Sequence, residues 1–233
     1  MIPLRDENPS TTVPIVNILL IITNVCIFVY QMYFASRDTQ DLFLRLGFIP
    51  FEVSHFVDIS PENLVPIPFT ILTAMFIHGG WLHLISNMLY LWIFGDNIED
   101  RLGHGKYLFF YVMCGMMASV VHGFMDINSK VPSVGASGAI AGVLAAYLYL
   151  FPGARIKTLF VVFVFAKIIK LPALVVLGLW ILAQVLSGFA EYGAQTGGGI
   201  AWFAHIGGFV SGLILIAVMR KRNRGRYSRK RIQ

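Results

Sequence analysis

The sequence predicts an all-α membrane protein in which six helices form a bundle and the fourth helix is short. Hydrophobic residues make up 57% of the 233 residues and charged residues 13%, whereas a water-soluble domain carries about a quarter charged residues. Mean hydropathy is +0.72, and several segments offer the roughly 20 predominantly apolar residues that a spanning helix needs. A soluble globular domain is therefore excluded.

The apolar segments are separated by breaks that contain charges, prolines or glycines. The expected helices cover residues 13–34, 81–98, 107–125, 137–151, 171–190 and 200–219. The fourth segment has about 15 residues, fewer than a full crossing needs, so it either does not span or begins below the membrane surface. We treat residues 13–219 as one membrane domain.

Two other segments mix charged and apolar side chains. Residues 37–68 contain charges and prolines among apolar residues, which predicts a first loop of short amphipathic pieces at the membrane interface. Residues 157–170 are apolar but edged by basic residues. This pattern indicates either an interfacial segment or an extension of the fifth helix.

Basic residues gather on one side of the predicted bundle. The tail 220–233 holds eight of the 18 lysines and arginines and directly follows an apolar segment, so we interpret it as an anchor near anionic lipid rather than a nucleic-acid-binding segment. With six spans, fifteen basic residues fall on the side of this tail and three on the other. The positive-inside rule then predicts that both termini, including residues 1–12, are cytoplasmic.

Four polar side chains are expected at one depth, slightly below the outer surface. They are His83 and Asn87 in the second helix, Ser137 at the head of the fourth and His205 about one turn inside the sixth. Polar groups at membrane depth are costly, so each is a functional hypothesis. His83 and Asn87 are four residues apart and share one helix face.

Small residues can bring the fourth and sixth helices together. Gly138 and Gly142 form one GxxxG pair, and Gly208 and Gly212 form another. This spacing lets helix backbones approach closely in lipid. If the two glycine pairs face each other, the serine and histidine that precede them come within hydrogen-bond reach.

This arrangement predicts acyl-transfer chemistry. A serine hydroxyl becomes a good nucleophile when a neighbouring imidazole takes its proton, and the reaction needs hydrogen-bond donors for the developing oxyanion. His83, the Asn87 amide and the backbone N–H of Ser137 are candidate donors. The fourth and sixth helices contain no Asp or Glu, which favours a Ser137–His205 dyad over a triad.

Structural interpretations of the same residues stay open. An isolated histidine in an apolar helix is often a hydrogen-bonded packing residue, a serine in a glycine-rich turn is often a helix cap, and His83 and Asn87 fit interhelical hydrogen bonds. A metal site formed by His78, His83 and His205 lacks a nearby carboxylate or HExxH spacing. We therefore expect no metal and no cofactor.

Four stretches resemble motifs of the rhomboid family of intramembrane serine proteases, in the order of that family. They read His78-Gly-Gly-Trp-Leu-His83-Leu-Ile-Ser-Asn87, Glu99-Asp-Arg101-Leu-Gly103, Gly135-Ala-Ser137-Gly138 and Ala204-His205-Ile-Gly-Gly208. The resemblance implies a rhomboid-like six-helix bundle that cleaves transmembrane proteins near the external ends of their helices.

The resemblance also implies roles for the matched residues. It makes Ser137 the nucleophile, His205 the general base, and His83 and Asn87 an oxyanion-stabilising pair. Supporting roles fall on the glycines Gly135 and Gly138 beside the nucleophile, on His78 in a water-retaining network, and on Glu99 and Arg101 as a structural pair at the cytoplasmic end of the second helix.

Two departures from the family pattern stand out. Well-known members carry an aromatic residue one turn after the nucleophile that packs against the base, whereas this chain has Ala141, so His205 is oriented less firmly than in those members unless another aromatic residue substitutes. The Trp-Arg pair that some members carry in the first loop is also absent. The glycine-rich residues 193–199 are a candidate lid over the site.

The function predicted from these residues is hydrolysis of peptide bonds in transmembrane protein substrates. We expect a multi-pass protein of the plasma or inner membrane, with the bilayer and membrane-protein substrates as partners and no nucleic acid. A catalytically silent relative that retains membrane clients is the alternative. A proton-relaying transporter is disfavoured, because the sequence shows neither paired inverted repeats nor intramembrane carboxylates.

Overall fold

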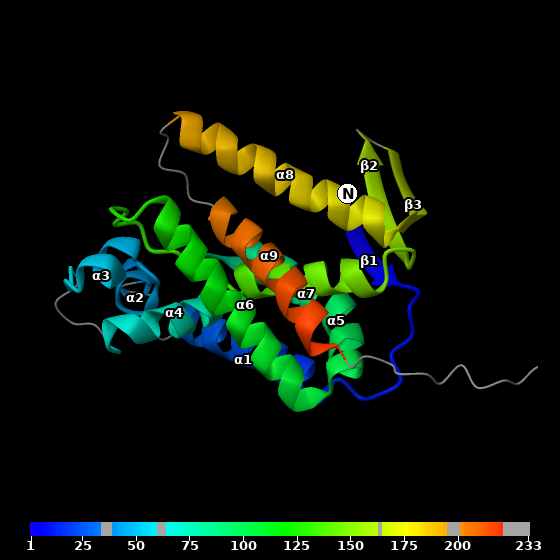
Figure 1. Cartoon of the computed structure of the whole chain (residues 1–233), viewed down its shortest axis with the longest axis horizontal. Helices are drawn as coiled ribbons and strands as arrows, with labels where there is room; N and C mark the ends of the chain where they lie inside the picture. Colours follow the sequence, from blue (N-terminus) through cyan, green and yellow to red (C-terminus); the bar gives the residue numbers. More distant parts are fainter. Residues whose placement is uncertain (34–38, 60–63, 163–164, 195–200, 221–233) are drawn as a thin grey trace, which may run out of the picture.

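The computed structural model describes residues 1–33, 39–59, 64–162, 165–194 and 201–220. The long helices form one bundle with a small sheet at one end (Figure 1). The helical elements are α1 (Ile15–Tyr33), α2 (Thr39–Leu46), α3 (Pro50–His55), η1 (Ile67–Phe69), α4 (Thr70–Thr73), η2 (Ala74–Phe76), α5 (Trp81–Leu102), α6 (His104–Met125), α7 (Ser137–Leu150), α8 (Ala173–Ala194) and α9 (Trp202–Met219).

The apolar character of the long helices makes the chain a multi-pass membrane protein. Helices α1, α6, α8 and α9 are each long and apolar enough to cross a membrane. Helix α5 meets the same criterion together with the segment Ile67–Phe76, to which it is bent by 80°. Helix α7 is apolar but only 14 residues long, and it covers most of the predicted segment 137–151; the count of six membrane helices stays a prediction.

Helix α7 lies at the centre of the bundle. All ten residues from Gly138 to Tyr147 are buried, and α5, α6, α8 and α9 pack around it. A helix that is apolar on every side is stable only when other elements surround it. The chain turns at Pro152 and Gly153 after α7 and enters the sheet, so Ser137 lies at the end of α7 that is remote from the sheet.

The segment between α1 and η1 contains the short helices α2 and α3, and its position at the membrane interface stays a prediction. Phe48 pairs with Ser133 through an isolated antiparallel bridge, which ties this loop to the segment that leads into α7. The candidate lid at residues 193–199 and the tail 220–233 extend into residues 195–200 and 221–233, which lie outside the described residues.

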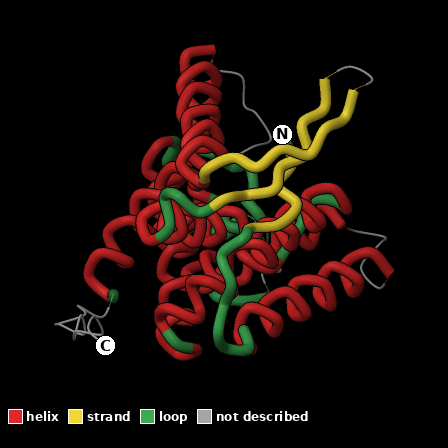
Figure 2. The backbone as a smooth tube through the Cα atoms, turned by 90° about the vertical axis from the view of Figure 1, so that its right-hand side faces the viewer, coloured by secondary structure: helices red, strands yellow, loops and turns green. Residues whose placement is uncertain are grey.

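A three-stranded antiparallel sheet was not predicted. Its strands are β1 (Ile2–Asp6), β2 (Arg155–Val162) and β3 (Phe165–Pro172), in the order β1-β2-β3. The prediction of a helical extension for residues 157–170 is therefore wrong. Figure 2 shows the sheet across one end of the helices, with the β2–β3 hairpin projecting beyond them.

The alternation of side chains in the hairpin explains why these residues form strands. Ile156 and Thr158 are fully buried, whereas Arg155, Lys157 and Leu159, on the other face of the strand, are exposed or half-buried. Ile156 belongs to the same apolar cluster as Ala173 and Leu177 of α8. An amphipathic strand pairs its backbone groups across the ladder, and one face is left to pack on the helices.

The segment after β1 is held along the bundle by side-chain hydrogen bonds. Tyr147 of α7 donates to the Asp6 carboxylate at 2.7 Å, and Asn97 of α5 donates to the same oxygen at 3.0 Å. Ser10 donates to Asp96 at 3.0 Å. The start of the chain therefore joins the sheet to the ends of α5 and α7.

The buried Glu99 carboxylate connects α5 to the start of α1. It is 0% exposed and accepts hydrogen bonds from the backbone N–H groups of Val16 and Asn17 at 2.9 and 2.8 Å. His104, at the start of α6, contacts the same carboxylate. The first N–H groups of a helix have no acceptor within the helix, so Glu99 satisfies two of them and complements the positive end of the α1 dipole.

Candidate active site

Ser137 and His205 lie side by side where α7 and α9 meet. The Ser137 Oγ atom is 2.8 Å from the His205 Nε2 atom. Both side chains are half-buried, and the helix that carries each begins within a turn of the residue. This is the geometry that a serine nucleophile and its general base require.

Close packing of glycines positions the two helices. A Cβ atom at Gly208 would overlap the carbonyl oxygen of Gly138, and one at Gly212 would overlap the backbone of Gly142. The two GxxxG pairs therefore face each other across the α7–α9 contact. Their backbones touch directly, so the Ser137 and His205 side chains have only a short distance to bridge.

Side chains of α8 and α9 contact the His205 ring and restrict its orientation. Its Nδ1 atom is 2.6 Å from Oε1 of Gln184 in α8, the Trp180 ring lies 5.8 Å away at a tilt of 39°, and the Trp202 ring lies 6.3 Å away and edge-on. Ala141 is fully buried. Trp180 thus provides the aromatic contact that Ala141 cannot provide.

Sequence reasoning missed Gln184, although a signal was present. An amide within an apolar helix that is long enough to cross a membrane is costly unless it finds a partner. Gln184 is 8% exposed and lies on the buried side of α8. The histidine it meets is 21 residues further along the chain, and no local pattern reveals that contact.

His83 and Asn87 present hydrogen-bond donors beside the serine. The backbone N–H of Gly79 donates to His83 Nδ1 at 3.3 Å, so the ring proton lies on Nε2, which faces Gly135. The buried Nδ2 group of Asn87 has no hydrogen-bond partner among the described residues and also lies near Gly135. Both side chains therefore lie beside the turn that leads into Ser137, and the first N–H groups of α7 have no acceptor within that helix.

Gly135 has a backbone conformation that requires glycine. Its φ is +123°, and a Cβ atom there would lie 2.7 Å from His83 Nε2. We therefore expect Gly135→Ala to strain the turn by about 1–3 kcal/mol and to displace the His83 ring. The rate of serine labelling by a fluorophosphonate should fall about 100-fold, as when one oxyanion donor is lost.

Gly79→Ala is the matched control for this substitution. Its added Cβ would meet the same His83 ring at an ordinary contact distance of 3.7 Å. Equal labelling rates for the Gly135 and Gly79 variants would contradict the role assigned to the turn.

His78 and Gln31 support the loop before α5. The Gln31 amide of α1 donates to the His78 carbonyl and accepts from the His78 N–H, both at 3.2 Å. The His78 ring is 1% exposed and lies 5.1 Å from the His83 ring. Gln31 is a second residue that sequence reasoning missed, and the role of His78 in a water network stays a prediction.

Glu99 and Arg101, predicted as a structural pair, have separate partners. Glu99 accepts from α1 and contacts His104, while the Arg101 guanidinium lies over the Phe151 ring, 5.1 Å from its centre. Both contacts fasten helix ends at the sheet side of the bundle, remote from Ser137.

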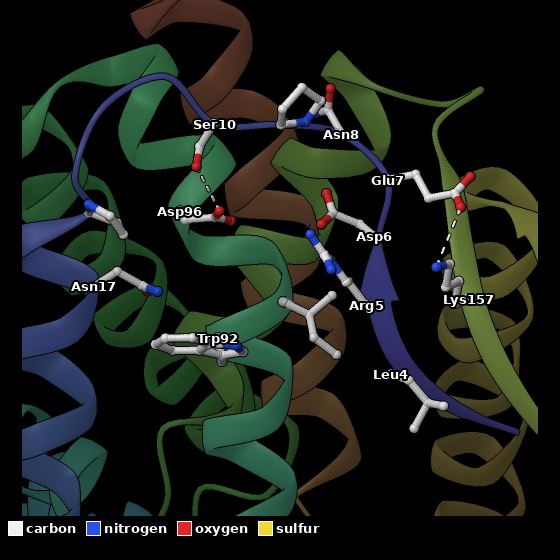
Figure 3. Close-up of a pocket in the computed structure, with 13 residues that line it drawn as sticks. Leu4, Arg5, Asp6, Glu7, Asn8, Ser10, Asn17, Trp92, Asp96 and Lys157 are labelled. Atoms are coloured by element: carbon white, nitrogen blue, oxygen red, sulfur yellow. Dashed lines mark hydrogen bonds and ion pairs between the residues drawn. The ribbon is translucent and has the colours of Figure 1, made fainter.

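Two cavities differ sharply in size and lining. A small one of about 20 Å³ touches Ser137, Gly135 and Ala204, which is enough room for one water molecule. A larger one of about 840 Å³ lies between β1, the start of α1 and the second half of α5 (Figure 3). Its lining mixes Arg5 and Lys157 with the carboxylates of Asp6 and Asp96.

Among the described residues, the lining of the larger cavity contains no histidine or cysteine, so it offers no nucleophile with a neighbouring imidazole. Burial raises the pKa of the Asp6 carboxyl, an effect opposed by the bond from Tyr147. Within the described part of the chain, no group of three or more His, Cys, Asp or Glu residues is arranged to hold a metal ion. Ser137 lines the small cavity and not the larger one.

Comparison with known proteins shows the family of the chain. The family model described as the Rhomboid domain matches residues 68–222, which include the glycine turn, the serine and the histidine. The chain belongs to the rhomboid family. The match covers α5 to α9, the part of the chain that forms and surrounds the candidate active site.

Curated rhomboid relatives come from bacteria and from organelles. The chain is 26% identical to Rhomboid-like protein 11, chloroplastic, of Arabidopsis thaliana over 87% of this chain and 64% of that protein. It is 31% identical to Rhomboid protein 1, mitochondrial, of Saccharomyces cerevisiae over 66% and 42%. It is 30% identical to Rhomboid protease GluP of Bacillus subtilis over 69% and 28%. The chain thus matches less than two thirds of each relative's length.

Proposed function

We propose that this rhomboid protein is an intramembrane serine endopeptidase that hydrolyses peptide bonds of transmembrane protein substrates. The observation that carries the proposal is the 2.8 Å contact between Ser137 Oγ and His205 Nε2. Family membership and the name of GluP, a rhomboid protease, support the same reaction.

In the proposed reaction, His205 Nε2 takes the hydroxyl proton as Ser137 Oγ attacks the carbonyl carbon of the scissile bond. Negative charge develops on the carbonyl oxygen, and the donors on His83, Asn87 and the Ser137 N–H stabilise it. The imidazolium then gives its proton to the leaving amine as the C–N bond breaks. Water then attacks the carbonyl carbon of the acyl-enzyme while His205 Nε2 takes its proton. The imidazolium returns this proton to Ser137 Oγ as the ester bond breaks, which releases the acid product and restores the serine.

The proposed orientation in the membrane follows from charge. All six helices would cross or enter the bilayer, with the sheet, the start of α1 and the end of α9 on the cytoplasmic side, where basic residues concentrate. Ser137 would then lie near the external surface, because α7 is short and begins at the opposite end. Irregular backbone such as the Gly135 turn is tolerated at that depth where it lines a cavity.

Serine labelling in proteoliposomes tests the proposed chemistry without knowledge of the substrate. We expect a fluorophosphonate to label the protein, and Ser137→Ala to lose both this label and cleavage of a transmembrane substrate. His205→Ala should slow both by at least about a thousandfold, since the hydroxyl loses its base.

Ser211→Ala is the matched control, because Ser211 is a buried serine on α9 that donates to the Gly208 carbonyl at 3.0 Å and has no role in the proposed chemistry. It should label like the unmodified protein. Cleavage that persists in Ser137→Ala would refute the proposed nucleophile. A protein that binds membrane clients but neither labels nor cleaves them would be the silent relative instead.

A further inference from the structure

We propose that Gln184 is a positioning residue that holds His205 in the tautomer and orientation needed for attack by Ser137. The inference rests on the proposed function, and it replaces the expected two-residue group by a chain of three side chains. Ser137, His205 and Gln184 come from α7, α9 and α8, and their two contacts measure 2.8 and 2.6 Å.

The orientation of the Gln184 amide is fixed within its own helix. Its Nε2 group donates to the Trp180 carbonyl at 3.4 Å, one turn earlier on α8. This bond directs the NH₂ group along the helix and leaves Oε1 facing His205. The amide therefore meets the imidazole with its acceptor.

An acceptor at this position selects one form of the histidine. Oε1 has no hydrogen to give, so the 2.6 Å contact requires a proton on His205 Nδ1. A neutral imidazole carries a single ring proton, which leaves Nε2 as a lone-pair acceptor directed at the Ser137 hydroxyl. The opposite tautomer would lose the Gln184 bond and present an N–H to the serine, which removes the base.

The buried position of the Gln184 amide strengthens its preference for the His205 tautomer that carries a proton on Nδ1. Gln184 is 8% exposed, and it continues the buried side of α8 that is formed by Val176, Leu177 and Gly188. A buried polar group that loses its partner is costly, so the amide and the imidazole hold each other in place. Trp180 and Trp202 restrict the ring further.

A neutral amide suits a site at membrane depth. As His205 takes the serine proton, the ring becomes an imidazolium with a proton on each nitrogen, and Nδ1–H continues to donate to Gln184. An Asp or Glu would stabilise that cation more strongly, but a carboxylate is much more costly to bury than an amide. Gln184 provides orientation without a permanent charge.

The test compares four substitutions in the full-length protein in proteoliposomes. Gln184→Leu keeps the volume and removes the acceptor, Gln184→Asn shortens the amide, Gln184→Glu keeps an acceptor and adds a charge, and Leu186→Ala changes a lipid-facing residue of α8 that is 63% exposed. The readouts are the second-order rate of fluorophosphonate labelling at Ser137, its pH profile, and the melting temperature.

Gln184→Leu and Gln184→Asn should slow labelling by about 10- to 100-fold, while Leu186→Ala should label like the unmodified protein. Gln184→Glu should recover most of the rate at high pH. Its pH profile should move to higher pH, because a carboxylate favours the imidazolium, and the free base then forms only at higher pH. A purely structural role for Gln184 would not move that profile.

An unchanged labelling rate in Gln184→Leu would overturn the proposal. The proposal would also be overturned if the labelling rate fell only in proportion to the loss of folded protein and the pH profile of Gln184→Glu matched that of the unmodified protein. Failure of the proposed function itself is distinguishable, because the unmodified protein would then show no labelling that depends on Ser137.

Discussion

Gly208→Ala is expected to reduce serine labelling by at least about 100-fold. The added Cβ would overlap the carbonyl oxygen of Gly138, so α9 must move away from α7 by a substantial fraction of an ångström or more. Ser137 and His205 lie on these two helices at 2.8 Å, and a misplacement of about 1 Å can cost a factor of about 100 in rate. The labelling rate of the purified variant in proteoliposomes measures this effect.

The matched control is Gly178→Ala in α8, where an added Cβ meets no atom of the described residues within 4 Å. It should keep the labelling rate and gain slightly in helix stability, since alanine is the better helix former. If Gly208→Ala labels as fast as Gly178→Ala, the close α7–α9 contact does not set the geometry of the reactive pair.

Glu99→Ala should destabilise the protein by about 2–5 kcal/mol without altering the reactive pair directly. The substitution leaves two backbone N–H groups of α1 without their acceptor and His104 without its contact. Loss of a buried, hydrogen-bonded charge is among the largest single-residue effects on stability. A lower melting temperature in detergent, with labelling by the remaining folded protein close to normal, is the expected result.

Asp100→Asn provides the comparison for Glu99→Ala. Asp100 is the next residue and also accepts hydrogen bonds from the chain before α1, from Thr11 and Thr12, but those bonds are exposed to solvent. Exposed hydrogen bonds exchange readily with water, so we expect a change of at most about 1 kcal/mol. Equal melting temperatures for both variants would contradict the importance of burial at Glu99.

The long helices and the close approach of α7 and α9 could be predicted from the sequence because their signals are local. Long apolar runs predicted the helical segments, and the glycine spacing after Ser137 and His205 predicted the close approach of α7 and α9 that the structure has. The catalytic roles of these residues stay proposals. In each case the pattern lies within one helix, or is repeated on two helices that pack together.

The sheet and the Gln184 contact were not predicted, because each depends on residues that lie far apart in the sequence. The residues of β1 pair with β2, about 150 positions later, and the alternation in residues 155–162 alone did not distinguish a strand from an interfacial segment. Nothing in the sequence around Gln184 indicates its contact with His205, which lies 21 positions later. At the bend between Ile67–Phe76 and α5, the backbone of His78 bonds to the side chain of Gln31, which lies 47 positions earlier.

The pairing of β1 with β2 imposes an order on biosynthesis. While a ribosome is still making α5 and α6, Ile2–Asp6 has been translated but β2 does not yet exist. Those five residues acquire a ladder partner only after Arg155–Val162 emerges. The Asp6 bond to Tyr147 likewise waits for α7. The sheet at this end of the molecule therefore forms late. If translation stopped before residue 155, Ile2–Asp6 would have no strand to pair with.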